Sequence, residues 1–243
     1  MIDKIVEWLK KQVKDAGVGG LIFGLSGGVD SAVVAALAKK AFPANVQALI
    51  MPCFSNPEDQ VHAELAAKKF GIPVKLIDLG ASFSMLYHQL EGKAYDGQKM
   101  DLAIANLKPR LRMMTLYYHA NKLNYLVVGT GNKSEAVMGY CTKYGDAGVD
   151  LLPLGNLLKT QVRDLAKELG VPPEIITKPP SAGLWLGQTD EGEMGISYAD
   201  LDKVIQGIAS NNLAGLDKKL VDLVSKKMKV TEHKRSLPPS FSL

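Results

Sequence analysis

Apolar residues recur along the chain at two spacings, which predict helices and strands in alternation. The first residues, MIDKIVEWLKKQVKD, predict an amphipathic helix because their apolar side chains stand at helical intervals among charges: Ile2, Ile5, Val6, Leu9 and Val13. Further helices are predicted at 29–41, from Asn56 onward, at 82–90 and at 99–121. The one that follows Asn56 has a capping residue, then Pro57 at its first position and an acid in its first turn.

Short apolar runs lie between these helices and predict strands. GGLIFGL at 19–25 and NVQALIMP at 45–52 are apolar enough to be buried on both faces of a parallel sheet. GIPVKLIDL at 71–79 and NYLVVGT at 124–130 predict two more strands. Strands and helices that alternate at this spacing predict the α/β class, with an open parallel sheet covered by helices on both faces.

The pattern changes beyond residue 140. GDAGVDLLPLGNLLKTQVRDLAKELGVPPEII predicts a loop, a short apolar segment and an amphipathic helix. Residues 181–195, SAGLWLGQTDEGEMG, have no period and many glycines, which predicts a mobile loop. A capping pair of Ser197 and Asp200 predicts a helix at 198–209, and another follows near 216–229. We expect one domain, 1–243, in which the part from about 140 adds loops and helices to the site.

Composition excludes several classes of protein. The net charge is +4, but basic residues are scattered among acids, which indicates at most a preference for anionic small molecules and no nucleic-acid partner. Two cysteines without a CxxC pair, Cys53 and Cys141, favour a reducing compartment over a disulfide framework or a zinc site. No apolar run approaches the roughly 20 residues of a membrane span, and the first helix is unlike a signal peptide. We therefore expect a cytoplasmic protein with no membrane partner.

The stretch FGLSGGVDS follows the first predicted strand and has the composition of a phosphate-binding loop. Ligands of open α/β sheets lie at the carboxyl ends of the strands, which places residues 24–31 at the mouth of a site. Gly27 and Gly28 let the backbone N–H groups face an anion, and Ser26 and Ser31 add hydroxyl donors to the positive end of the next helix. A tight turn without a ligand is the alternative interpretation of Ser-Gly-Gly alone.

Asp30 makes this loop unusual. A carboxylate beside a phosphate is repulsive unless a divalent cation lies between them, so Asp30 predicts Mg²⁺. The loop also lacks the lysine of a Walker A motif and does not match the dinucleotide fingerprint GxGxxG.

SGGVDS resembles the pyrophosphate loop of the adenine nucleotide alpha-hydrolase superfamily, whose members split ATP between the α and β phosphates. KPRLRM at 108–113, VGTGNKSEAVMGYCTKYGDAGVDLLPL at 128–154 and TEHKR at 231–235 resemble the NAD synthetase family, and this resemblance covers nearly the whole chain. It implies the Rossmann-like fold of that superfamily. It also implies amidation of deamido-NAD by ammonia, with ATP as co-substrate and Mg²⁺ as cofactor, through an acyl-adenylate to NAD, AMP and pyrophosphate.

The resemblance assigns the residues of the ATP site. They are Gly24, Leu25, Ser26, Gly27, Gly28, Val29, Asp30, Ser31, Thr130, Lys159 and Ser181. Asp30 and Glu135 would share the metal, and Lys159 would supply the cation that the loop lacks and offset charge on the departing pyrophosphate.

The resemblance assigns deamido-NAD to a second set: Arg110, Lys143, Asp150, His233 and Lys234. Cationic groups suit a dinucleotide with a pyrophosphate and a free carboxylate. Catalytic roles fall to Lys159, Ser181 and Asp146, the last as a carboxylate that helps ammonium lose its proton. Residues 182–195 would close over the site and exclude water, although Trp185 and Leu186 are equally consistent with a packing anchor. The family also implies a homodimer, and the apolar residues around the helix at 99–121 agree with burial on more than one side.

The sequence departs from the NAD synthetase pattern in two places, and two other functions remain as alternatives. GTGNKSE replaces the Gly-Thr-Asp-His form of ammonia-using enzymes and looks more like glutamine-using synthetases, whereas the chain length leaves no room for a glutaminase domain. Ser181 replaces a frequent threonine and keeps the hydroxyl. A tRNA thiolase or lysidine synthetase would use the same loop, but thiolases need catalytic cysteines, and Cys53 and Cys141 fit small buried residues better. A nucleotide sensor would lack the metal acids.

Overall fold

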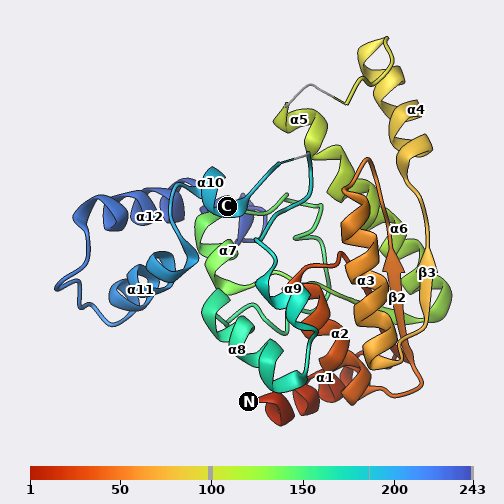
Figure 1. Cartoon of the computed structure of the whole chain (residues 1–243), viewed down its shortest axis with the longest axis horizontal. Helices are drawn as coiled ribbons and strands as arrows, with labels where there is room; N and C mark the ends of the chain where they lie inside the picture. Colours follow the sequence, from red (N-terminus) through yellow and green to blue (C-terminus); the bar gives the residue numbers. More distant parts are fainter. Residues whose placement is uncertain (98–100, 186, 242–243) are drawn as a thin grey trace.

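The computed structural model describes residues 1–97, 101–185 and 187–241, and contains a parallel sheet with helices packed against it (Figure 1). The strands are β1 (Gly20–Gly24), β2 (Val46–Ile50), β3 (Val74–Leu76) and β4 (Tyr125–Val128), in the order β3-β2-β1-β4. Every neighbouring pair is parallel. The chain order reverses between β1 and β4, so the sheet has a switch point at the end of β1, where the glycine loop begins.

Helices connect and cover the strands. They are α1 (Ile2–Ala16), α2 (Val29–Ala41), α3 (Pro57–Phe70), α4 (Gly80–Glu91), α5 (Leu102–Ala105), α6 (Leu107–Leu123), α7 (Lys133–Met138), α8 (Lys159–Leu169), α9 (Pro173–Thr177), α10 (Asp190–Met194), α11 (Tyr198–Ala209), α12 (Lys218–Val230) and the 3-10 turn η1 (Glu232–Lys234). Asn56 accepts a hydrogen bond from the backbone N–H of Glu58 at the start of α3, as its sequence predicts. None of the described helices is long and apolar enough to cross a membrane.

Successive side chains of β1 enter different cores because strand residues alternate between the two faces of a sheet. Leu21 and Phe23 pack with α1, α2, α3, α8 and α9, whereas Ile22 packs with α4 and α6 on the other face. The predicted α/β class, with a parallel sheet covered on both faces, is therefore confirmed. A third apolar cluster joins α7 to α11 and α12, which lie to one side of the sheet, away from α3 and α4 (Figure 1).

The helix predicted over 99–121 is wrong in its first part. The structure divides it into α5 and α6, with Asn106 between them. A proline ring clashes with the carbonyl of the residue four positions earlier, and for Pro109 that residue is Ala105, the last of α5. The predicted start at Lys99 lies outside the described residues. Several of its apolar residues are also exposed, among them Met114 at 60% and Tyr118 at 62%.

The C-terminal part follows its sequence pattern more closely. The Ser197 side chain accepts from the Asp200 N–H and caps α11, as predicted. The next helix begins at Lys218 instead of near 216, because Asp217 caps it by accepting from the Lys219 N–H. The segment expected to be a loop at 181–195 contains the short helix α10, and its Leu186 lies outside the described residues.

Candidate active site

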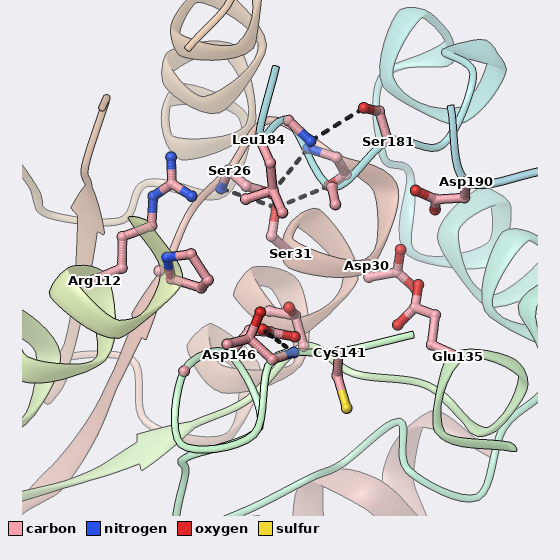
Figure 2. A pocket seen from close by; sticks show the side chains of 18 of the residues that line it. Ser26, Asp30, Ser31, Arg112, Glu135, Cys141, Asp146, Ser181, Leu184 and Asp190 are labelled. Carbon is pink, nitrogen blue, oxygen red and sulfur yellow. Dashed lines mark hydrogen bonds between the residues drawn. The ribbon is translucent and has the colours of Figure 1, made fainter. Parts of the chain in front are cut away.

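A cavity of about 730 Å³ opens at the carboxyl ends of the strands (Figure 2). The glycine loop, the ends of β2 and β4, α7, α8 and the described residues of 178–190 supply its walls. The site residues predicted from the sequence that line it are Gly24, Leu25, Ser26, Gly28, Val29, Asp30, Ser31, Thr130, Glu135, Asp146, Lys159, Ser181 and Lys234. The predicted residues Gly27, Arg110, Lys143, Asp150 and His233 do not line it.

Hydrogen bonds made by its two serines fix the conformation of the glycine loop. Ser31 Oγ accepts from the backbone N–H of Ser26 at 3.2 Å and donates to the carbonyl of Gly28 at 2.9 Å. The two serine hydroxyls lie 3.1 Å apart. Gly28 is the N-cap of α2 and has no side chain with which to cap it, so the first N–H groups of this helix remain available to an anion.

Gly27 is required by both conformation and space. Its φ of +80° lies in the left-handed region that side chains disfavour. A Cβ atom at this position would lie 2.1 Å from the backbone oxygen of Asp59, so the loop packs directly on the first turn of α3. The residue supports the cavity from behind rather than lining it.

Three charged side chains from three helices meet on the cavity wall. Lys159 Nζ, on α8, lies 2.5 Å from Asp30 Oδ2 on α2 and 3.1 Å from Glu135 Oε1 on α7. Burial lowers the pKa of Lys159, but the two carboxylates outweigh this effect and raise it, which keeps the lysine charged. Burial raises the pKa of Glu135 to about 7, although Lys159 opposes the shift. The lysine is needed because two buried carboxylates would otherwise repel each other.

Asn132 connects the two carboxylates and was not predicted from the sequence. Its side-chain oxygen accepts from the Glu135 N–H at 3.0 Å, and the Asn132 N–H donates to Glu135 Oε2 at 3.2 Å, so the pair forms a capping box at the start of α7. Asn132 Nδ2 also donates to Asp30 Oδ1 at 2.9 Å. An amide has both a donor and an acceptor for these two contacts. In the departure GTGNKSE, Asn132 takes the place of the histidine of Gly-Thr-Asp-His, and it makes these contacts there.

Asp190 is a second residue that sequence analysis missed, because it lies at the start of α10 in the segment expected to be a loop. Tyr198 donates to Asp190 Oδ2 at 2.9 Å, but Asp190 Oδ1 is buried without a hydrogen-bond partner in the described structure. Burial raises the pKa of Asp190. The Tyr198 hydroxyl also lies 3.4 Å from Glu135 Oε1, so this aspartate is adjacent to the charged cluster.

The carboxylates suit a hard cation, which prefers oxygen ligands. Asp30 and Glu135 each place an oxygen within 3.1 Å of one point, which Lys159 Nζ occupies. The described residues contain no preformed group of three or more acids, histidines or cysteines for a metal. The donor chemistry thus fits Mg²⁺ between Asp30 and Glu135, with Lys159 as the group that neutralises the same oxygens.

Asp146 lines the same cavity, beside Cys141 (Figure 2). Its Oδ1 accepts from the backbone N–H of Thr142 at 2.8 Å. Burial raises the pKa of Asp146, and the hydrogen bonds from Thr142 oppose the shift. A shielded carboxyl of this kind is suited to proton transfer, and the role of Asp146 stays a prediction.

The residues predicted to bind the second substrate form two groups. Arg110 donates to the carbonyl of Lys143, and Lys143 Nζ donates to the carbonyl of His233 at 2.6 Å, so Lys143 contacts both residues outside the cavity. Asp150 instead accepts from the Val127 N–H of β4 at 2.7 Å and from the Tyr117 hydroxyl. Lys234 enters the cavity wall, where Nζ donates to the carbonyls of Gly139 and Cys141. These roles in binding stay predictions.

Arg112 lines the cavity beside the end of β2 and was also missed, although it lies in the motif KPRLRM (Figure 2). Its guanidinium donates to the Met51 carbonyl at 3.1 Å and to Ser55 Oγ at 3.1 Å. Burial lowers the pKa of Arg112. The signal was its position, two residues after Arg110, within a motif already singled out.

A glycine loop at a switch point of a parallel sheet, with an acid at the start of the next helix, defines the class of α/β proteins that bind nucleotides at this edge. Within that class, a sequence profile of the family described as NAD synthase matches residues 1–238. The chain belongs to the NAD synthase family.

Curated relatives and solved structures agree with this assignment. The NH(3)-dependent NAD(+) synthetase of Carboxydothermus hydrogenoformans is 50% identical over 237 residues, which cover 97% of this chain and 94% of that protein. The synthetase of the same name from Archaeoglobus fulgidus is 46% identical, with 98% and 95% covered.

Two solved structures are similar along the whole chain. The NMN synthetase of Francisella tularensis has a TM-score of 0.90 at 35% identity, with 100% of this chain and 97% of that chain covered. The NH3-dependent NAD synthetase of Campylobacter jejuni has a TM-score of 0.84 at 29% identity, with 99% and 97% covered.

The packing of Gly27 predicts an asymmetric effect of two neighbouring substitutions. Gly27→Ala should lower the free energy of unfolding by about 2–4 kcal/mol, because the new methyl group meets the Asp59 backbone and φ is positive. Gly28→Ala, whose Cβ would contact only Ser26 Oγ at 3.5 Å, should lower it by less than about 1 kcal/mol. Urea denaturation measures both, and equal losses would contradict the packing of the loop on α3.

The state of Cys141 predicts slow alkylation. Burial, followed by the nearby charge of Asp146, raises the pKa of this thiol to about 11. The thiolate fraction at pH 8 is then about a hundredfold below that of an ordinary cysteine. Iodoacetamide labelling from pH 7 to 10, followed by peptide mass spectrometry, should show Cys141 reacting appreciably only at the alkaline end. Rapid labelling near pH 7 would contradict this and return the thiolase alternative to consideration.

Proposed function

We propose that the chain catalyses the ATP-dependent amidation of deamido-NAD by ammonia, which gives NAD, AMP and pyrophosphate through an acyl-adenylate. Similarity to NH(3)-dependent NAD(+) synthetases along nearly the whole chain supports the reaction. The observation that carries the proposal is the convergence of the glycine loop, Asp30, Glu135 and Lys159 on one cavity. This combination of N–H donors, carboxylates and a buried cation suits a triphosphate that loses pyrophosphate.

The first step is adenylation. The nicotinate carboxylate attacks the α-phosphorus of ATP, a new P–O bond forms, and the bond to pyrophosphate breaks. The N–H groups after Gly28 and the hydroxyls of Ser26 and Ser31 bind phosphate oxygens, and the Lys159 ammonium offsets the charge that accumulates on pyrophosphate. Asp30 and Glu135 would hold Mg²⁺, which supplies further neutralisation of phosphate oxygens when bound. Ser181, Thr130 and the backbone of 24–31 complete this proposed ATP site.

The second step is amide formation. Ammonia attacks the activated acyl carbon, the C–N bond forms, and the C–O bond to AMP breaks. The nitrogen must lose a proton, and we assign this transfer to Asp146, a buried carboxyl that lines the same cavity. Water must be excluded from the site because it would hydrolyse the acyl-adenylate. Residues 181–185 line the cavity and contribute to this exclusion.

The second substrate and the assembly remain part of the proposal. We assign deamido-NAD to Arg110, Lys143, Asp150, His233 and Lys234. The exposed Met114 and Tyr118 on α6 are consistent with a homodimer, which would cover this face. We also propose that the chain functions as one domain in the cytoplasm and takes free ammonia as its nitrogen source.

A second candidate substrate follows from the solved structures. The protein from Francisella tularensis that shares a TM-score of 0.90 is named NMN synthetase. The corresponding reaction here would amidate nicotinate mononucleotide by the same two steps. The two candidates differ only in whether the adenylyl half of the dinucleotide contributes to binding.

The first experiment compares both substrates directly. Purified protein with ATP, Mg²⁺, ammonium and deamido-NAD should form NAD, and omission of any component or addition of a chelator should abolish it. Parallel reactions replace deamido-NAD by nicotinate mononucleotide, and ammonium by glutamine, with products separated by chromatography. We expect at least about a tenfold preference in kcat/KM for deamido-NAD if its adenylyl half is bound.

Each result decides a separate part of the proposal. A preference for the mononucleotide would establish the second candidate and refute the assigned dinucleotide contacts. Product from glutamine alone would refute ammonia as the nitrogen source. ATP binding without pyrophosphate release under any condition would refute the synthetase and favour the sensor, whereas release that requires tRNA would favour a tRNA-modifying enzyme.

Lys159 predicts a large kinetic effect. Lys159→Met should lower kcat by about 10²–10³-fold, because the cation that stabilises the departing pyrophosphate is lost. Lys167→Met is the matched control on the same helix, since Lys167 is exposed and, among the described residues, pairs only with Asp164 at 3.1 Å. Circular dichroism checks that both variants fold. A Lys159→Met enzyme within about threefold of the control would remove Lys159 from the mechanism.

A further inference from the structure

Lys108 is a buried lysine that the mechanism above does not use. It lies in the first turn of α6, is 1% exposed and does not line the cavity. No ion pair with a described acidic side chain involves it. Its Nζ instead donates to the backbone carbonyl of Leu184 at 2.6 Å, across 76 residues of sequence. A buried ammonium without a carboxylate requires another source of stabilisation.

Three aromatic rings supply that stabilisation. The centroids of Phe54, Phe83 and Tyr95 lie 5.9, 5.7 and 5.9 Å from Lys108 Nζ. The ring of Tyr95 packs edge to face on the other two, with centroids 4.9 and 4.8 Å away. The negative faces of aromatic rings attract a cation, most strongly where water is excluded. These three rings, here called the aromatic cage, come from the loop between β2 and α3, from α4 and from the loop that follows α4.

The lysine joins this cage to the cavity wall. Leu184 lines the cavity together with Ser181 (Figure 2). Both backbone polar groups of Leu184 are held, since its N–H donates to Gln188 Oε1 at 2.7 Å and its carbonyl accepts from Lys108. Lys178 pairs with Asp59 on α3 at 2.6 Å and fixes the chain just before Ser181. The described residues 178–185 are thus attached to the sheet side of the cavity at two points.

We propose that Lys108 is a positioning residue, which holds the backbone of residues 181–185 in place on the cavity wall that Ser181 lines. The consequence for catalysis rests on the proposed function, but the attachment itself does not. A neutral side chain of similar length would fill the aromatic cage and leave the Leu184 carbonyl without its donor. The N–H donor of Lys108, rather than its volume, is therefore the property that positions the segment.

Trp185 offers a direct readout, because Trp8 is the other tryptophan of the chain and can be replaced. In a Trp8→Phe background, Lys108→Met should increase acrylamide quenching of Trp185 by about twofold and shift its emission to longer wavelength. The same variant should lower kcat/KM for ATP by about 10–100-fold, as expected when a substrate contact is misplaced. Lys122→Met is the matched control, since Lys122 is a lysine near the other end of α6 that lies over the Tyr118 ring instead of contacting residues 181–185.

The outcomes separate the attachment from the reaction. Trp185 quenching in Lys108→Met equal to that in Lys122→Met would overturn the proposal, whatever the activity. Greater quenching with an unchanged kcat/KM would overturn the role in catalysis. If the parent protein forms no NAD, the proposed function fails, while the fluorescence measurement still tests the attachment.

A second variant guards against loss of folding in Lys108→Met. Phe54 is 47% exposed, so Phe54→Leu removes one ring of the aromatic cage at little risk to the core. It should change Trp185 quenching in the same direction by a smaller amount. No change in this folded variant would also overturn the proposal.

Discussion

The ion cluster of Lys159, Asp30 and Glu135 is the interaction on which the rest of the site depends. Each member comes from a different helix, so α2, α7 and α8 must all be in place before the charges compensate one another. Removal of a partner from a buried cluster leaves an uncompensated charge, which is far costlier than loss of an exposed pair. The cluster therefore links the chemistry of the cavity to the correct packing of the helices around it.

The sheet determines where this cluster forms. The chain order reverses beside β1, so the loop after β1 and the loop after β4 leave the same edge in different directions and enclose a space. Asp30 follows the first strand and Glu135 the last, which explains how residues a hundred positions apart in sequence share one lysine. Segments from the C-terminal half then close the space, and the buried polar groups of Asp190 and Tyr198 lie where these segments meet the cluster.

The sheet, its covering helices and the glycine loop were predictable because each depends on local signals: short apolar runs, helix caps and the Ser-Gly-Gly turn. The convergence of Asp30, Glu135 and Lys159 followed from a resemblance rather than from spacing. Asn132, Asp190 and Lys108 were not predicted, since their importance lies in contacts with distant residues that no periodicity records. The break at Asn106 was missed although Pro109 was visible, because the apolar pattern of the surrounding residues continues through it.

The third apolar cluster, of α7, α11 and α12, shows that the ion cluster also connects two hydrophobic cores. Glu135 is carried by a helix of that cluster, while Asp30 is carried by a helix packed on the sheet. The two carboxylates thus lie on either side of a boundary between two hydrophobic cores, and Lys159 connects them by pairing with both. A ligand that binds both acids stabilises the contact between these cores as well as the local charge. Occupancy of the cavity and the packing of these two cores against each other therefore depend on the same three side chains.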